Sequence, residues 1–201
     1  MIRSMLLQDL VEPGRTLTAA DFAARYAEPV LLILRVELEG VGLREGLPTP
    51  LPSRPPAPPP RGPRDEIETA PASKTGVAEQ LRRIAAATLV LPIGKHKVNL
   101  YQDKITLGRA PNNDVVLPHP TVSKFHGYFR AEGAAMTFTD YASQNGTRVA
   151  WELLAPRVAH PLRDAVQLHF GDVPARYHTP AGLYDYLRGF VVGGEAGNPR
   201  A

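Results

Sequence analysis

The sequence contains no cysteine among its 201 residues. Disulfide bonds, thiolate zinc sites, iron–sulfur clusters and cysteine nucleophiles are therefore excluded. Because proteins of oxidising compartments often depend on disulfides, this absence favours a cytoplasmic protein. The sequence also has little excess of charge of either sign. The 23 basic and 20 acidic residues leave a net charge of +3, which is too small to indicate binding to nucleic acid or to a membrane.

Long hydrophobic runs are missing as well. The longest uninterrupted apolar run, Val30 to Leu34, has five residues, whereas a helix needs about 20 to cross a bilayer. Near the amino terminus, Asp9 and Glu12 interrupt the apolar residues that a signal peptide would need. We therefore expect neither a leader nor a membrane anchor.

Proline is abundant and unevenly spread. Nine of the 21 prolines lie between Pro48 and Pro63, where their fixed φ and missing N–H groups favour extended polyproline II over helix or sheet. We predict a Pro-rich flexible linker at residues 47–75, between an N-terminal segment at 1–46 and a main domain at 76–190, with a disordered tail at 191–201. A docking site for a proline-recognising module is the alternative interpretation of the linker.

The N-terminal segment has the pattern of one helix and one strand. Thr18 and Asp21 form a capping-box pattern that begins a helix with Phe22 and Tyr26 on one side. Pro29 ends this helix. The apolar run that follows, and the alternating residues 35–39 after it, predict a strand. One helix and one strand cannot bury a core alone, so we expect residues 1–46 to pack on the main domain or on a partner.

The main domain consists of short apolar runs separated by turn residues. Turns at intervals of about 8–12 residues are typical of an antiparallel sandwich or barrel. We expect strands at residues 89–93, 97–101, 104–107, 114–117, 125–130, 136–141, 147–151, 165–170 and 175–178.

Two helices are expected to flank these strands. The first begins at Thr75 or Gly76, and its apolar stripe consists of Val77, Leu81 and Ile84. The second begins at Pro180, a favourable first position for proline. Its inward stripe consists of Leu183, Tyr184 and Leu187.

Five motifs follow one another between the expected strands: Gly108-Arg109, Asn113 to Leu117, Ser123 to His126, Asn145 to Thr147, and Arg163 to Gly171. In this order and spacing they resemble the forkhead-associated (FHA) family over about residues 88–180. The resemblance implies a mainly β fold, an FHA-like antiparallel β-sandwich with a short C-terminal helix, here with a small α/β N-terminal segment joined by the Pro-rich linker. It also implies recognition of phosphothreonine. Arginine outnumbers lysine 18 to 5, which suggests a bacterial member.

The resemblance implies four residues that bind the phosphopeptide. Arg109 offers a planar fork that can bond two phosphate oxygens, Ser123 adds a hydroxyl, and Lys124 adds a second positive charge. Asn145 has both a donor and an acceptor for the peptide backbone. Each residue also has a simpler interpretation: Arg109 and Lys124 as solvated surface residues, Ser123 as a turn cap, and Asn145 with Gly146 as a hairpin turn.

Four further residues are expected to support the binding loops. Gly108 and Gly146 let the backbone approach the ligand, and Thr147 completes the Asn-Gly-Thr motif. The resemblance implies that His126 holds its loop through internal hydrogen bonds. A metal site shared by His126 and His119 is the alternative, which the intervening proline and the lack of nearby carboxylates disfavour. We expect no metal and no cofactor.

Two positions depart from the pattern of the family. Gln144 stands where Thr or Ser usually precedes Asn-Gly, so a hydroxyl near the phosphate is missing and Ser143 is its only substitute. After Thr147, Ala150-Trp151 replaces the usual Asn-Gly turn. Both departures bear on peptide preference more than on phosphate binding.

The leading hypothesis is a non-catalytic module that binds phosphothreonine peptides and recruits or senses targets of Ser/Thr kinase signalling. The expected partner is a phosphothreonine-containing protein, which is a Ser/Thr protein kinase or its substrate. The alternative is a structural adaptor that acts without phosphorylation. An enzyme is not expected, because the sequence has no nucleophile motif and no glycine-rich nucleotide loop. The sequence predicts no oligomeric state.

One threonine of the linker suggests regulation. Thr69 follows three acidic residues in DEIETAPAS, where a kinase could reach it, and the phosphorylated residue would fold back onto the domain's own site. An unmodified linker threonine is the simpler interpretation.

Overall fold

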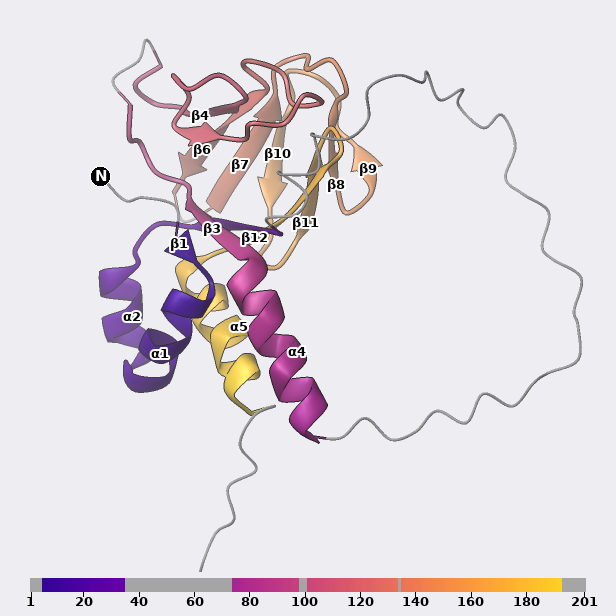
Figure 1. The fold of residues 1–201 in the computed structure, drawn as a ribbon. Helices are drawn as coiled ribbons and strands as arrows, with labels where there is room; N and C mark the ends of the chain where they lie inside the picture. Colours follow the sequence, from indigo (N-terminus) through magenta and orange to yellow (C-terminus); the bar gives the residue numbers. More distant parts are fainter. Residues whose placement is uncertain (1–4, 35–73, 98–100, 134, 193–201) are drawn as a thin grey trace, which may run out of the picture.

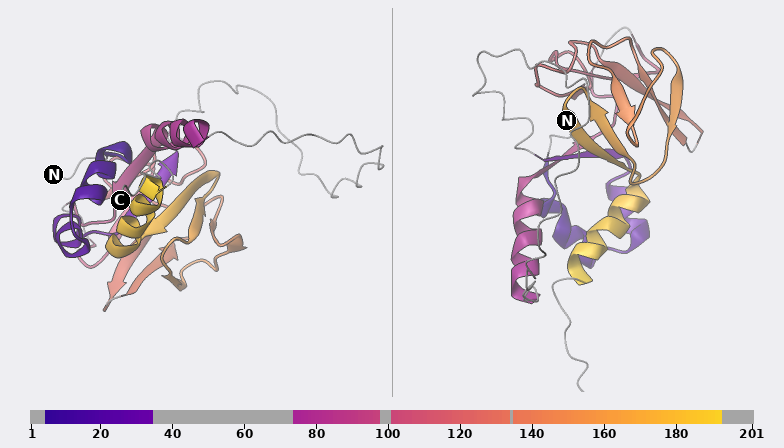
Figure 2. Two further views of the ribbon diagram at one scale, coloured as in Figure 1. Left: turned by 90° about the horizontal axis from the view of Figure 1, so that it is seen from below. Right: turned by 90° about the vertical axis from the view of Figure 1, so that its right-hand side faces the viewer.

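The computed structural model describes residues 5–34, 74–97, 101–133 and 135–192. They form two β-sheets packed face to face and a group of helices on one side of the pair (Figure 1). The right-hand view of Figure 2 separates the helices, below, from the sheets, above. The prediction of a mainly β sandwich with a C-terminal helix is confirmed.

The larger sheet joins strands from both ends of the chain. Its order is β1 (Met5–Leu6), β3 (Thr88–Pro92), β2 (Val30–Leu34), β12 (Val173–His178), β11 (Gln167–Phe170), β8 (Thr147–Val149) and β9 (Glu152–Leu153). The smaller sheet has the order β10 (Ala159–Leu162), β7 (Ala135–Asp140), β6 (Gly127–Glu132), β4 (Ile105–Gly108) and β5 (Val115–Val116). The pair β4–β5 is parallel, whereas the sequence predicts antiparallel pairing throughout.

The core of the sandwich is built from the inward-facing side chains of both sheets. Phe129 of β6, Phe138 of β7 and Phe170 of β11 are fully buried. Their ring centroids lie 4.8 Å apart for Phe129 and Phe138, and 5.2 Å apart for Phe138 and Phe170. Tilted and edge-to-face pairs of this kind add about 0.5–1.5 kcal/mol each beyond the area that they bury.

Strand β2 lies inside the larger sheet, between β3 and β12. Leu31 and Ile33 face the core of the sandwich, and Val30 and Leu32 face a second apolar cluster under the helices. A strand covered on both faces needs apolar residues throughout, which explains the uninterrupted run. Residues 5–34 thus pack on the main domain, one of the two outcomes expected for the N-terminal segment. The linker, its boundary at residue 46 and the alternating residues 35–39 lie outside the described residues.

The helices pack on the outer face of β1, β2 and β3. They are α1 (Gln8–Thr16), α2 (Ala19–Arg25), α4 (Lys74–Ala87) and α5 (Pro180–Val192). Thr18 caps α2 as predicted, because its hydroxyl accepts the N–H of Asp21 at 3.2 Å. Leu183, Tyr184 and Leu187 of α5 are buried, also as predicted. No helix in the described part of the chain is long and apolar enough to span a membrane.

Several details differ from the predicted elements. β1, β9, β10 and α1 have no predicted counterpart, and the strand expected at 97–101 includes residues 98–100, which lie outside the described ones. Helix α1 contains Pro13, which normally ends a helix. Strand β10 contains Pro161, which is tolerated at the edge of a sheet. In α4, Ile84 is 37% exposed and Ala85 is buried in its place.

Candidate functional site

Three loops meet at one end of the sandwich and bring the predicted site residues together. They are the loop after β4, the loop before β6 and the loop between β7 and β8. Arg109 begins the first loop, and its main-chain N–H donates to the carbonyl of Ser123 at 2.9 Å. The Nε of Arg109 donates to the carbonyl of Val122 at 3.2 Å. The guanidinium is therefore held at one nitrogen, while its two terminal nitrogens have no hydrogen-bond partner among the described residues.

Ser123 and Asn145 connect the second loop to the third. The hydroxyl of Ser123 accepts the main-chain N–H of Gln144 at 3.1 Å. The side-chain amide of Asn145 donates to the carbonyl of Thr121 at 2.8 Å. Each side chain keeps unused capacity, because the Ser123 hydroxyl can still donate its proton and the Asn145 side-chain oxygen can still accept.

Lys124 holds the first two loops together through its backbone. Its carbonyl accepts the N–H of Ala110 at 3.1 Å and the side-chain amide of Asn113 at 2.8 Å. Its side chain is exposed. A Cβ at Gly108 would lie 2.4 Å from the same carbonyl. Glycine is required here because the backbone at this position lies close to the main chain of Lys124. Gly146 has a φ of +72°, which glycine adopts without strain.

A chain of buried hydrogen bonds lies under these loops. The Nδ1 of His126 accepts the N–H of Ser123 at 3.2 Å, and its Nε2 lies 3.1 Å from the hydroxyl of Thr147. That hydroxyl donates to the carboxylate of Asp140 at 2.6 Å. Ser143 donates its N–H and its hydroxyl to the same carboxylate, at 2.8 and 2.6 Å.

The contacts fix the protonation state of this chain. Because Nδ1 of His126 accepts a hydrogen bond, the ring proton lies on Nε2 and is donated to Thr147. Burial lowers the pKa of His126, and the nearby charge of Asp140 opposes that shift without reversing it. A neutral His126 thus orients the main chain at Ser123. The hydroxyl of Ser143 is committed to Asp140, so Ser143 does not replace the hydroxyl that is missing at Gln144.

A metal site at the two loop histidines has no support in the geometry. Nδ1 of His119 lies 2.8 Å from the hydroxyl of Thr121, and His126 points into the buried chain. The described residues contain no group of three or more potential metal ligands.

Thr121 and Asp140 also hold the site loops, although neither is among the residues predicted from the sequence. The hydroxyl of Thr121 accepts the N–H of Asp172 at 3.0 Å, and its carbonyl accepts the amide of Asn145. Asp140 is 2% exposed and accepts three hydrogen bonds. No local pattern marks Thr121, because its partners Asn145 and Asp172 lie on loops distant in sequence. Asp140 accepts from Ser143 three residues later, a local Asx-turn pattern that could have marked it. Thr69, the candidate phosphorylation site, lies outside the described residues.

Residues 105–171 match the family model of the FHA domain. The chain contains an FHA domain. The matched range includes all four residues expected to bind the phosphopeptide and the buried chain beneath them, from Arg109 to Thr147. It covers about a third of the chain and leaves β1, β2, β3 and the helices outside the matched part.

Known proteins resemble part of the chain. The Mediator of DNA damage checkpoint protein 1 of Rattus norvegicus is 40% identical over 83 residues, which are 39% of this chain and 6% of that protein. The Homo sapiens protein is 36% identical over 83 residues and is covered over 4% of its length. The chain thus spans only a small part of these curated relatives.

Solved structures resemble it more weakly. Mycobacterium tuberculosis EmbR, in complex with a low-affinity phosphopeptide, has a TM-score of 0.37 and 24% identity, over 45% of this chain and 21% of that one. The MEK1 FHA domain, in complex with the HOP1 pThr318 peptide, has a TM-score of 0.37 and 21% identity, over 45% of this chain and 87% of that one.

Proposed function

We propose that the FHA domain of this chain binds phosphothreonine in a peptide through Arg109, Ser123, Lys124 and Asn145. The observation that carries the proposal is the geometry of Arg109. Its Nε is anchored on a main-chain carbonyl and its terminal nitrogens are unpaired among the described residues. A phosphate dianion carries a charge of about −1.5 to −2 and strong acceptor oxygens, and a guanidinium fixed in this way presents two parallel donors to it.

The neighbouring groups complete a binding surface. The free hydroxyl proton of Ser123 and the ammonium of Lys124 flank the same loop, and the side-chain oxygen of Asn145 suits an N–H of the peptide backbone. Because the loops are already joined by hydrogen bonds, little further ordering is needed on binding, which favours affinity. Two charge-assisted bonds contribute about 3 kcal/mol or more together, which corresponds to about 100-fold in Kd.

Isothermal titration calorimetry with a degenerate phosphothreonine peptide library tests the assignment. We expect Arg109→Ala to weaken binding at least 100-fold, and Arg109→Lys, which keeps the charge and loses the fork, to weaken it about tenfold. Arg130→Ala is the matched control, because Arg130 lies toward the other end of β6 and pairs with Asp103. Equal affinities of wild type and Arg109→Ala would contradict the proposal.

We also propose a partner and a cellular location for this protein. A module that distinguishes phosphothreonine from threonine serves to recruit or sense a Ser/Thr protein kinase or its substrate. We place it in the cytoplasm and in a bacterial organism on the composition of the sequence. An FHA domain is a binding module, and its role here is recognition rather than catalysis.

A phosphate-independent adaptor is the second candidate. Trp151 and Leu153 favour it, because these apolar side chains are 69% and 65% exposed on the β8–β9 hairpin. Binding that survives both Arg109→Ala and the removal of phosphate would support this role.

A further inference from the structure

The turn between β8 and β9 holds the chain's single tryptophan in an unfavourable conformation. Ala150 has a φ of 48° and Trp151 a φ of 74°, both in the left-handed region that glycine adopts easily. For other residues this region costs about 1–2 kcal/mol each. Trp151 is nevertheless 69% exposed, with its ring 4.6 Å from that of His169. Strain of this kind concentrates at binding sites, so the exposed indole calls for a functional explanation.

The side chains around Trp151 form one continuous surface, which we call the outer face. Leu168 and Phe170 of β11 point into the sandwich, so His169 between them points outward. In the sheet, Leu153 lies opposite Arg148, Arg148 opposite His169, and His169 opposite Pro174. The outer face therefore runs across β9, β8, β11 and β12, with Trp151 packed over His169.

The outer face continues into a groove where the helices end. The groove has a volume of about 250 Å³, and its walls include Leu34, Ile84, Pro174, Arg176 and Tyr186. Leu34 and Ile84 are 41% and 37% exposed. Together with Trp151 and Leu153, they make four of the seven exposed large apolar side chains of the described residues. Exposed apolar groups gathered on one face indicate a binding surface.

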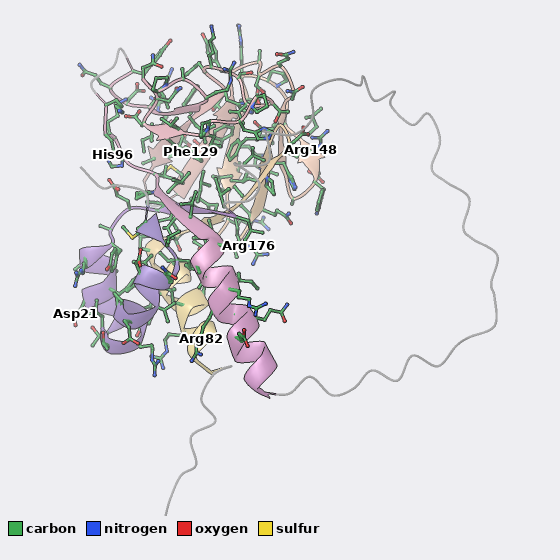
Figure 3. The ribbon with its side chains drawn as sticks, in the orientation of Figure 1. Asp21, Arg82, His96, Phe129, Arg148 and Arg176 are labelled. Carbon is green, nitrogen blue, oxygen red and sulfur yellow. The ribbon has the colours of Figure 1, made fainter. Side chains whose placement is uncertain are left out.

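The charges of the outer face are positive. Arg148 and Arg176 lie between buried residues of their strands and so project outward. Figure 3 labels Arg148 beside β8 and Arg176 above α4. Neither has an ion-pair partner among the described residues, and Arg176 is the one charged residue of the groove wall. Glu152 lies opposite Val149, on the other face of its hairpin.

We infer that the outer face binds an acidic segment of a partner protein, in which carboxylates alternate with large apolar side chains. The arginines supply charge-assisted bonds to the carboxylates, and Trp151, Leu153 and the groove bury the apolar groups. Tryptophan and arginine are the residues most often found at the energetic centre of interfaces. Two copies meeting through this face would oppose arginine to arginine, which disfavours self-association here.

This surface borders the phosphopeptide site at Leu153, because a Cβ at Gly146 would lie 2.7 Å from the Leu153 side chain. Gly146, in the loop of that site, directly precedes β8, and the Ala150–Trp151 turn follows the other end of the strand. Trp151 therefore lies at the end of β8 away from the phosphopeptide site, so that a phosphorylated protein and an acidic partner are bound next to each other on one chain.

The single tryptophan reports on the proposal directly. The full chain is titrated with acetyl-Leu-Glu-Leu-Glu-Leu-Glu-amide and with the same peptide carrying lysine in place of glutamate, and Trp151 fluorescence is followed. We expect a saturable blue shift with the glutamate peptide, at least tenfold tighter than with the lysine peptide. The double variant Arg148→Glu and Arg176→Glu is expected to reverse this preference. Absence of the shift, equal affinities, or an unchanged preference in the double variant would overturn the inference.

Control variants separate this inference from the proposed function and from other occupants. Arg109→Ala and Arg130→Glu are expected to leave the fluorescence titration unchanged, even if phosphopeptide binding fails. Replacing Glu37 and Glu39 by glutamine is expected to have no effect. Tighter peptide binding in that variant would identify the chain's own segment as the occupant. A dimer in sedimentation velocity that Trp151→Gly abolishes would identify a second copy, and either result would refute a partner protein.

Discussion

Replacing Thr147 by valine tests the buried hydrogen-bond chain that holds the site loops. Thr147 is fully buried, and its hydroxyl accepts from Nε2 of His126 at 3.1 Å and donates to Asp140 at 2.6 Å. Valine keeps the shape of the side chain and removes both bonds. His126 then loses its bond to the Thr147 hydroxyl, and Asp140 loses one of its three hydrogen bonds.

The magnitude follows from these two losses. A hydrogen bond between neutral groups contributes about 0.5–1.5 kcal/mol, and a hydrogen bond to a charged group contributes about 1.5–3 kcal/mol. The extra methyl of valine returns roughly 1 kcal/mol of apolar burial. We therefore expect Thr147→Val to lower the free energy of unfolding by about 2 kcal/mol. Thr147→Ser keeps the hydroxyl and loses one methyl, for a loss of about 1 kcal/mol.

Urea unfolding at pH 7 measures both variants. The prediction is that Thr147→Val unfolds at clearly lower urea than Thr147→Ser, with the same dependence of free energy on denaturant. If valine is tolerated as well as serine, the hydroxyl does not link His126 to Asp140 as described, and the reasoning about the loops is refuted.

Three further predictions concern packing, pH and regulation. Gly108→Ala is expected to lower the free energy of unfolding by about 1–3 kcal/mol, because its Cβ would lie 2.4 Å from a main-chain carbonyl; an unchanged urea midpoint would contradict this. Burial raises the pKa of Asp114, but hydrogen bonds from Thr106 and residues 95–97 outweigh burial and lower it. Its stabilising contribution is therefore complete above the unfolded pKa of about 3.9 and is lost as the pH falls below it; unfolding curves from pH 7 to pH 3 should show a smaller loss of stability in Asp114→Asn. Phosphorylation of Thr69 is expected to shift the NMR signals of the site loops in wild type and not in Arg109→Ala; unchanged signals in wild type would exclude an internal contact.

Local patterns predict most of the strands, because apolar and polar residues alternate within many of them. Alternation and turn residues give eight of the strands within a few residues, and Thr18 and Pro180 predict two helix starts. The position of β2 within the larger sheet cannot be predicted from local patterns. Its five apolar residues indicate burial on both faces, but only the fold selects β3 and β12 as its neighbours. Pro13 and Pro161 conceal α1 and β10, because both prolines occupy positions that their usual preferences disfavour.

Some residues of the candidate site can be predicted from local motifs and others cannot. The motif residues from Gly108 to Thr147 are found by their order in the sequence, and the structure brings their loops together. Thr121 is missed because its partner Asn145 is 24 positions away, whereas Asp140 is missed although Ser143, three positions later, donates to it. Ser143 is the opposite case, because its sequence position suggests a phosphate contact and its hydroxyl instead donates to Asp140. Hydrogen bonds between loops that are distant in the sequence leave no local signature.

The central claim is that the fixed guanidinium of Arg109 recognises phosphate. Its most direct test is the ratio of dissociation constants for one peptide in its threonine and phosphothreonine forms, measured by calorimetry with the full chain. We predict a ratio of about 100 or more in wild type, falling close to one in Arg109→Ala. A ratio close to one in wild type would contradict the claim.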